Sequence, residues 1–141
     1  MIIPINLYKK IIESIPIVCV DIIIQNNQSK ILLVKRNTEP LKEEWWVIGG
    51  RINKGENILE AAKRKVLEEV GLKIINLDFF GIYEDQYENS AFSNNSNYHT
   101  ISIVYKTRVQ NIDGFKLNKY SSSWKWSKSL PKRFIVNKVI K

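Results

Sequence analysis

The chain has 141 residues, of which 44% are hydrophobic, and both values are typical of one folded domain with one core. No apolar run reaches the ~20 residues of a bilayer-spanning helix, and the N-terminus lacks the basic start and cleavage site of a signal peptide, so we expect neither a membrane span nor secretion. The net charge is +8, and the whole excess comes from residues 116–141, which hold eight basic side chains and no acidic one.

Two interpretations of this basic segment are open. A cluster of lysines attracts polyanions, but it also forms an ordinary solvated surface. The segment lacks the aromatic and glycine signatures of the common RNA-binding modules, so we do not expect a nucleic-acid partner. Cys19 is the only cysteine, and we interpret it as a buried strand residue in a reducing compartment, which predicts a cytoplasmic protein.

The first half of the chain predicts a helix followed by strands. Residues 7–15 have the apolar spacing of a short amphipathic helix, which Pro16 ends. Residues 17–25 are rich in Val and Ile, as in a strand buried on both faces, and residues 31–36 return as its hairpin partner. A short strand is expected at 45–48, just before Gly49 and Gly50.

The second half predicts one long helix and further strands. Glu56 and Asn57 open the helix and Gly71 closes it. We expect the remaining elements to be strands at 81–87, 101–109 and 124–126, a mobile Asn- and Ser-rich loop at 88–97, and a terminal helix after Pro131. This order predicts an α+β fold in a single domain, residues 1–141.

The stretch from Trp45 to Leu72 carries the chemistry. Its two glycines let backbone approach a ligand closely, and the helix that follows places Glu68 and Glu69 on adjacent turns with Arg64. Carboxylates beside exposed carbonyls suit a hard cation such as Mg²⁺, which would be shared with substrate phosphates. The alternative is an ordinary solvated helix face on which Glu68 pairs with Arg64.

The same stretch resembles the Nudix box, in which Gly, five residues, Glu, seven residues and Arg-Glu-aliphatic-x-Glu-Glu-x-Gly-aliphatic follow one another. Eight positions are in register: Gly50, Glu56, Arg64, Val66, Glu68, Glu69, Gly71 and Leu72. Lys65 stands where the first Glu of the Arg-Glu pair belongs. The resemblance implies an α/β/α sandwich with a mixed sheet and one long catalytic helix.

Over nearly its full length the chain is most similar to the GDP-mannose mannosyl hydrolase branch of that family. The residues that carry this likeness are SIPIVCVDIII (14–24), ILLVKR (31–36) and GGRINKGENILEAA (49–62). That branch also departs from the general box at the position of Lys65. The likeness implies hydrolysis of a nucleotide sugar of the GDP-mannose or GDP-glucose type at the sugar C1–O bond. The products would be GDP and free sugar. The cofactor would be Mg²⁺, with Mn²⁺ as the alternative, and the protein would be a homodimer.

Roles can be carried over by position, as what the resemblance implies. The metal ligands would be the Gly49 carbonyl, Glu69 and Glu68. The residues that contact substrate would be Tyr8, Asp21, Arg36 and Arg51. The two arginines would hold the diphosphate. Tyr8 would contact the nucleotide, either within one chain or across a dimer interface. The catalytic set would be Arg51, Arg64, Glu68 and Asp85.

One departure leaves the general base open. The branch carries a Gln-His pair shortly before its C-terminal tryptophan, and Tyr120 and Ser121 occupy those positions here. Neither is a good base or Mg²⁺ ligand near pH 7. His99, the only histidine, matches a branch residue that is not the base, and we interpret it as structural. Glu84 or Asp85 could activate water instead.

Three functions therefore stay open: hydrolysis of a nucleoside-diphosphate sugar at the sugar carbon, pyrophosphohydrolysis at phosphorus, and nucleotide-sugar binding without catalysis. Loss of the glutamate at position 65 disfavours the second, and the Tyr120–Ser121 pair favours the third. Because Lys65 and Glu69 are four residues apart on one helix, we also expect their side chains to meet.

Overall fold

The computed structural model describes residues 2–88 and 97–140, with the side chain of residue 140 left aside. The loop expected at 88–97 falls almost wholly outside the described residues. The helices are α1 (Ile5–Ser14), α2 (Ile58–Val70) and α3 (Lys132–Val136); the strands are β1 (Ile17–Gln25), β2 (Ile31–Arg36), β3 (Trp45–Trp46), β4 (Ile48–Arg51), β5 (Asp78–Tyr87), β6 (Tyr98–Arg108), β7 (Ser121–Ser127) and β8 (Lys138–Ile140).

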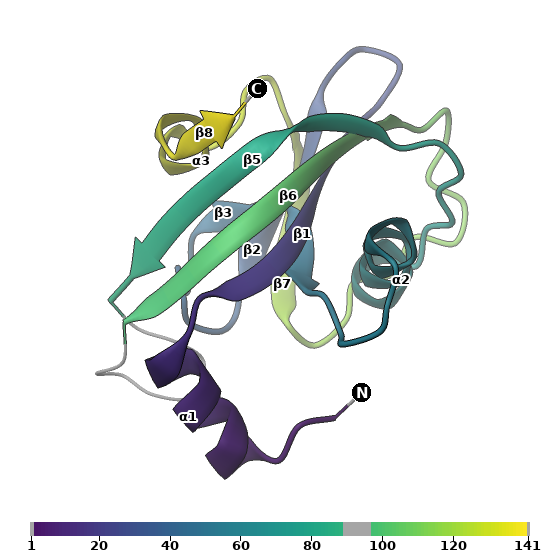
Figure 1. The fold of residues 1–141 in the computed structure, drawn as a ribbon. Coiled ribbons are helices and arrows are strands. Elements are labelled where there is room, and N and C mark those ends of the chain that lie inside the picture. The colour runs from purple at the N-terminus through teal and green to yellow at the C-terminus, as the bar shows by residue number, and fades with distance from the viewer. Residues whose placement is uncertain (1, 89–96, 141) are drawn as a thin grey trace.

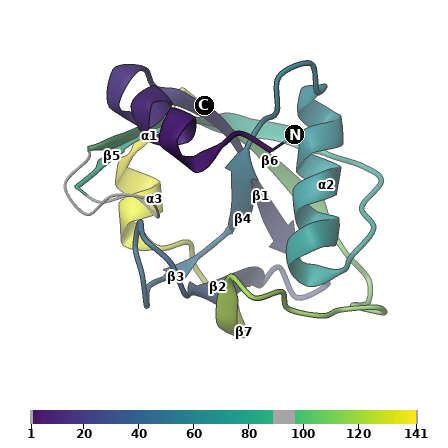
Figure 2. The ribbon, with the colours of Figure 1, turned by 90° about the horizontal axis from the view of Figure 1, so that it is seen from below.

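The eight strands form one mixed sheet, as the α+β expectation required. Its main order is β3-β2-β1-β6-β5-β8, with β4 paired to β1 and β7 paired to β2. Among the described strands, only the long β1–β6 pairing is parallel, and it runs from Ile17 opposite Thr100 to Gln25 opposite Arg108. Figures 1 and 2 show α2 and α3 on opposite sides of this curved sheet. The α/β/α sandwich is therefore confirmed.

Strand β1 is buried on both faces, as its composition predicts. Val20, Ile22 and Ile24 pack in the core cluster under α2, whereas Ile23 lies in the second cluster with Phe134 of α3. Successive side chains of a strand point to opposite faces, so a strand between two helical layers needs apolar residues at every position. Asp21 is the one carboxylate within this strand, and its position matters for the site described below.

The boundaries follow the local chemistry closely. Helix α2 begins after Asn57, whose side chain accepts a hydrogen bond from the Leu59 backbone N–H, and it ends at Gly71 in the left-handed conformation. Strands β1 and β2 have the predicted bounds. The predicted strand at 45–48 was wrong in one respect: it is two short strands, which pair with different neighbours, β2 and β1.

The C-terminal segment packs onto the sheet through several of its basic side chains. Lys138 lies over the Phe80 ring at 3.9 Å, Lys125 lies over the Trp45 ring at 4.4 Å, and Arg133 forms an ion pair with Asp85. Ammonium and guanidinium groups are attracted to aromatic faces and carboxylates. These contacts favour a structural role for part of the basic excess. Within the described residues, no helix is long and apolar enough to cross a membrane.

Candidate active site

The centre of the site is the place where helix α2 meets strand β4. The Glu69 side chain is buried, and its Oε2 accepts a hydrogen bond of 3.2 Å from the Gly49 backbone N–H. Burial raises the pKa of the Glu69 carboxyl to about 7, against the lowering influence of Lys65 and Arg36 nearby. Such a carboxylate has lost water without gaining a full countercharge, so a cation placed beside it would be stabilising.

Gly49 lies opposite Asp21 where β4 pairs with β1. A Cβ built on Gly49 would lie 1.8 Å from Asp21 Oδ1 and 2.6 Å from the Val20 carbonyl oxygen. No side chain fits there, so glycine is required by space rather than by a special backbone angle. The structure shows the Gly49 N–H bound to Glu69, whereas the role of its carbonyl as a metal ligand stays a prediction.

Asp21 lies opposite Gly49 in the β1–β4 pairing and is partly buried. Ser102 on β6 donates a hydrogen bond of 2.5 Å to Asp21 Oδ2. Burial raises the pKa of Asp21 to about 6, while this hydrogen bond and the charge of Arg36 pull it down. The partner that a buried carboxylate needs is thus Ser102, and the sequence could not identify it across 81 positions.

Arg64 organises the loop that leads into α2. Its Nε donates to Glu56 Oε2 at 2.6 Å, and its Nη2 donates to Glu56 Oε1 at 2.9 Å and to the Arg51 carbonyl at 3.1 Å. The Glu68 carboxylate lies 3.3 Å away, as an i,i+4 pair. The Arg64–Glu68 pair of the alternative interpretation, a solvated helix face, is present, but the shorter bidentate contact is to Glu56. Arg64 therefore acts here as a positioning residue for the backbone of the loop.

The Glu56–Arg64 pair should make stability depend on acidity. The hydrogen bonds from Arg64 hold the pKa of Glu56 at about 2, below its ordinary value of 4.5. A depressed pKa contributes stability above the ordinary value and loses it as pH falls toward the folded-state value. We expect the Glu56→Gln variant to lose less free energy of unfolding than the wild type between about pH 4.5 and 2. Urea unfolding across this range measures it, with the exposed Glu60→Gln as control; parallel curves for Glu56→Gln and wild type would contradict it.

A single cleft gathers most of the predicted site residues. Its wall combines charged residues that the sequence singled out with apolar residues at the start of the chain. The lining residues are Ile2, Ile3, Ile5, Tyr8, Arg36, Thr38, Gly49, Arg51, Asn53, Arg64, Lys65, Glu68, Glu69 and Tyr120. Three arginines and a lysine thus share the wall of one solvent-open cleft with two glutamates. Opposite charges around one cleft are the arrangement that a metal-bound polyphosphate requires.

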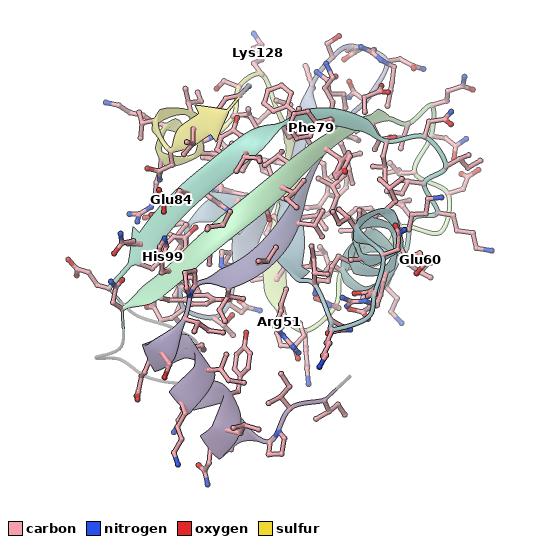
Figure 3. The ribbon with its side chains drawn as sticks, viewed as in Figure 1. Arg51, Glu60, Phe79, Glu84, His99 and Lys128 are labelled. Carbon is pink, nitrogen blue, oxygen red and sulfur yellow. The ribbon has the colours of Figure 1, made fainter. Side chains whose placement is uncertain are left out.

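Tyr8 lies in this cleft but is buried, with 8% of its surface exposed. The Arg51 guanidinium carbon lies 5.0 Å from the centre of its ring, and Ile12 and Cys19 belong to the same apolar cluster. A ring packed in this way holds Arg51 in place. Figure 3 shows Arg51 at the end of the sheet near α1. Contact between Tyr8 and a nucleotide stays a prediction.

Tyr120 and Ser121 differ in exposure at the start of β7. The Tyr120 ring is about half exposed and lines the cleft, whereas Ser121 is buried. From the sequence, both residues were interpreted as unsuitable replacements for a metal ligand and a general base. The exposed Tyr120 ring in the cleft was not predicted. No spacing signal could have revealed this, because β7 reaches the site through its pairing with β2.

Asp85 lies in a neighbouring cavity on the inner face of the sheet. This cavity and the one beside Gly49 share the lining residues Asp21, Trp46, Tyr87, Thr100 and Ser102. However, Asp85 accepts hydrogen bonds from Arg133 at 2.5 and 2.7 Å and from Asn137 at 2.9 Å. These contacts join β5 to α3 and occupy the carboxylate. They favour a structural role, and catalysis by Asp85 stays a prediction.

The only histidine pairs away from the cleft. His99 Nε2 lies 2.7 Å from Glu84 Oε2, and Figure 3 shows the two side chains together on β6 and β5. Glu84 is exposed, while Asp85 beside it lines the inner cavity, as the alternation of a strand requires. Neither residue of this pair lines the cleft that contains Glu69.

The oxygen ligands in the cleft fit a hard divalent cation, which they would bind with modest affinity. Glu68 and Glu69 offer carboxylate oxygens beside a backbone turn, which is the chemistry that Mg²⁺ or Mn²⁺ prefers. Within the described residues, no group of three or more His, Cys, Asp or Glu side chains could hold a metal on its own. Mg²⁺ commonly completes its shell with water and substrate phosphates, so this pair suits an ion brought in with a diphosphate.

Residues 16–128 of the chain match the family model of the NUDIX domain. Among curated proteins, the low-salt glycan biosynthesis protein Agl8 of Haloferax volcanii is 28% identical over 107 residues, which are 76% of this chain and 68% of the relative.

Two shorter matches have higher identity. The ADP-ribose pyrophosphatase of Methanocaldococcus jannaschii is 37% identical over 90 residues, 64% of this chain and 49% of that protein. The putative 8-oxo-dGTP diphosphatase of Bacillus subtilis is 41% identical over 63 residues, 45% of this chain and 40% of that protein. The chain thus spans half or less of these two relatives.

Solved structures agree on the fold. The MutT protein of Methanosarcina mazei superposes with a TM-score of 0.70 at 24% identity, over 86% of this chain and 89% of that one. The NUDIX domain of Shewanella oneidensis NrtR, solved with ADP ribose, gives 0.65 at 17% identity, over 81% and 73%. At these identities the likeness establishes the architecture alone.

Proposed function

The chain belongs to the NUDIX family, and from that premise we propose that it hydrolyses a nucleoside diphosphate linked to a sugar, with Mg²⁺ or Mn²⁺ as cofactor. The observation that carries the proposal is the cleft that Arg36, Arg51 and Lys65 line together with Glu68 and Glu69. Such a cleft supplies a metal to one side of a diphosphate and fixed positive charges to the other.

Each part of the substrate has a counterpart in the cleft. Arg36 and Arg51 bind the diphosphate oxygens, and Glu69 with Glu68 holds the cation. The bound cation neutralises the diphosphate and makes it a better leaving group. The half-exposed Tyr120 ring offers a stacking surface to the base. Asp21 and Ser102 line the cavity behind Gly49, where sugar hydroxyls would find a carboxylate and a hydroxyl.

Lys65 favours attack at the sugar carbon over attack at phosphorus. A lysine ammonium cannot accept a proton from water, so this position supplies no carboxylate base beside the phosphates. We propose hydrolysis of the C1–O bond, in which water adds to the sugar carbon and the nucleoside diphosphate leaves with the bonding electrons. The match to a glycan biosynthesis protein supports a nucleotide sugar of the GDP-mannose or GDP-glucose type.

The named activities of two other relatives support the alternative, cleavage at phosphorus. Product analysis separates the candidates. The purified chain is incubated with GDP-mannose and Mg²⁺, and the products are resolved by anion exchange. GDP with free mannose is expected. GMP with mannose phosphate would establish cleavage at phosphorus instead, and saturable binding without turnover would make the chain a nucleotide-sugar binding protein.

A further inference from the structure

Lys65 occupies the space between the two carboxylates of the site. Its Nζ lies 3.6 Å from Glu68 Oε2 and 3.9 Å from Glu69 Oε2. The Lys65 side chain is only 16% exposed, so it does not point to solvent. The contact expected from the i,i+4 spacing is thus present. It is more enclosed than the surface pairs that contribute only ~0.3–0.5 kcal/mol.

The Lys65 side chain lies against Gly50. A Cβ on Gly50 would lie 2.7 Å from Lys65 Cε and 3.2 Å from its Nζ. The aliphatic stem of Lys65 therefore lies against bare backbone, and its ammonium projects toward Glu68 and Glu69. A long charged side chain buries its stem and leaves the charged end where it finds polar partners.

The charges around this point leave a role for Lys65. Arg64 is held by Glu56 through two short hydrogen bonds and shares Glu68 with Lys65 at 3.3 Å, whereas Glu69 pairs with Lys65. Two carboxylates and one ammonium give a net charge of −1 when all are ionised. One divalent cation brings this group to +1, and the arginines of the same cleft add to it, which suits a diphosphate.

We propose that the Lys65 ammonium takes the place of one metal ion between Glu68 and Glu69. When a divalent cation binds these carboxylates, the ammonium contacts the diphosphate instead. This inference rests on the proposed diphosphate site. Lys65 competes with the metal for the carboxylate oxygens, so it lowers the affinity of the substrate-free protein for divalent cations. It also gives the cleft a fixed positive charge that binds diphosphate without metal.

The first arm of the test uses the metal alone. Mn²⁺ is titrated into the substrate-free wild type and into Lys65→Met, a variant of similar shape without charge, by isothermal calorimetry. We expect Lys65→Met to bind Mn²⁺ about tenfold more tightly, which is about 1.4 kcal/mol. The matched control is Lys63→Met, which removes the same charge from an exposed position of α2. An equal gain in Lys63→Met would overturn the proposal, because net charge alone would explain it.

The second arm uses inorganic pyrophosphate in the presence of a chelator. Lys65→Met is expected to bind pyrophosphate about tenfold more weakly than the wild type, while Lys65→Arg and Lys63→Met bind it nearly as the wild type does. Melting temperatures establish that each variant is folded, and Lys65→Gln replaces Lys65→Met if the latter is not. Unchanged Mn²⁺ and pyrophosphate affinities at position 65 would overturn the proposal. Neither arm uses a nucleotide sugar, so failure to hydrolyse GDP-mannose would count against the proposed function alone.

Discussion

The Glu69→Gln variant should lose metal-dependent hydrolysis of the nucleotide sugar, by about 100-fold or more, and keep its fold. Glu69 is the buried carboxylate at the junction of α2 and β4, and a carboxamide removes the negative charge that a hard cation requires. The neutral side chain still accepts the hydrogen bond from the Gly49 N–H. Since burial already raises the pKa of Glu69 to about 7, a neutral group at this position should cost little stability.

Initial rates over a range of Mg²⁺ concentrations, together with melting temperatures, test this expectation. The matched control is Glu60→Gln, the same substitution at an exposed position in the first turn of α2. We expect Glu60→Gln to keep the wild-type rate. Wild-type turnover by Glu69→Gln at sub-millimolar Mg²⁺ would remove Glu69 from the metal site.

The elements with strong local signals were predictable from the sequence. The Val- and Ile-rich composition of β1 predicted a strand buried on both faces, and Asn57 and Gly71 predicted the ends of α2. Both kinds of signal depend on residues close in the chain, where periodicity and capping chemistry decide the structure. The approach of Lys65 to Glu69 was predictable for the same reason, because helix geometry places positions four apart side by side.

Contacts between distant segments were not predictable in this way. The pairing of Asp21 with Ser102 depends on the parallel register of β1 and β6, and the ion pair of Asp85 with Arg133 depends on where α3 docks. No local pattern encodes either arrangement. The burial of Tyr8 likewise follows from the packing of α1 beside Arg51. The grouping of Glu68, Glu69 and Lys65 on one helix could therefore be predicted from the sequence, whereas the cavity behind Gly49 required the structure.

Gly49→Ala should destabilise the protein more than any other single-methyl change near the site. The added Cβ would lie 2.6 Å from the Val20 carbonyl oxygen and still closer to Asp21 Oδ1. Both belong to β1, which is held by β6 on one side and β4 on the other, so this backbone cannot move aside. Overpacking in a rigid core costs about 1–3 kcal/mol or more. We expect a fall in melting temperature of about 10 °C, or loss of soluble protein.

Gly50→Ala is the matched comparison, because it adds the same methyl group one residue along β4. There the nearest atoms belong to the far end of the Lys65 side chain, which can turn away at small cost. Gly50→Ala should therefore melt within a few degrees of the wild type. The double variant Asp21→Ala, Gly49→Ala should remain destabilised relative to Asp21→Ala, since the Val20 carbonyl stays in place. Equal melting temperatures for Gly49→Ala and Gly50→Ala would mean that β4 can withdraw from β1, and that the close contact between Gly49 and Asp21 is not fixed by the sheet.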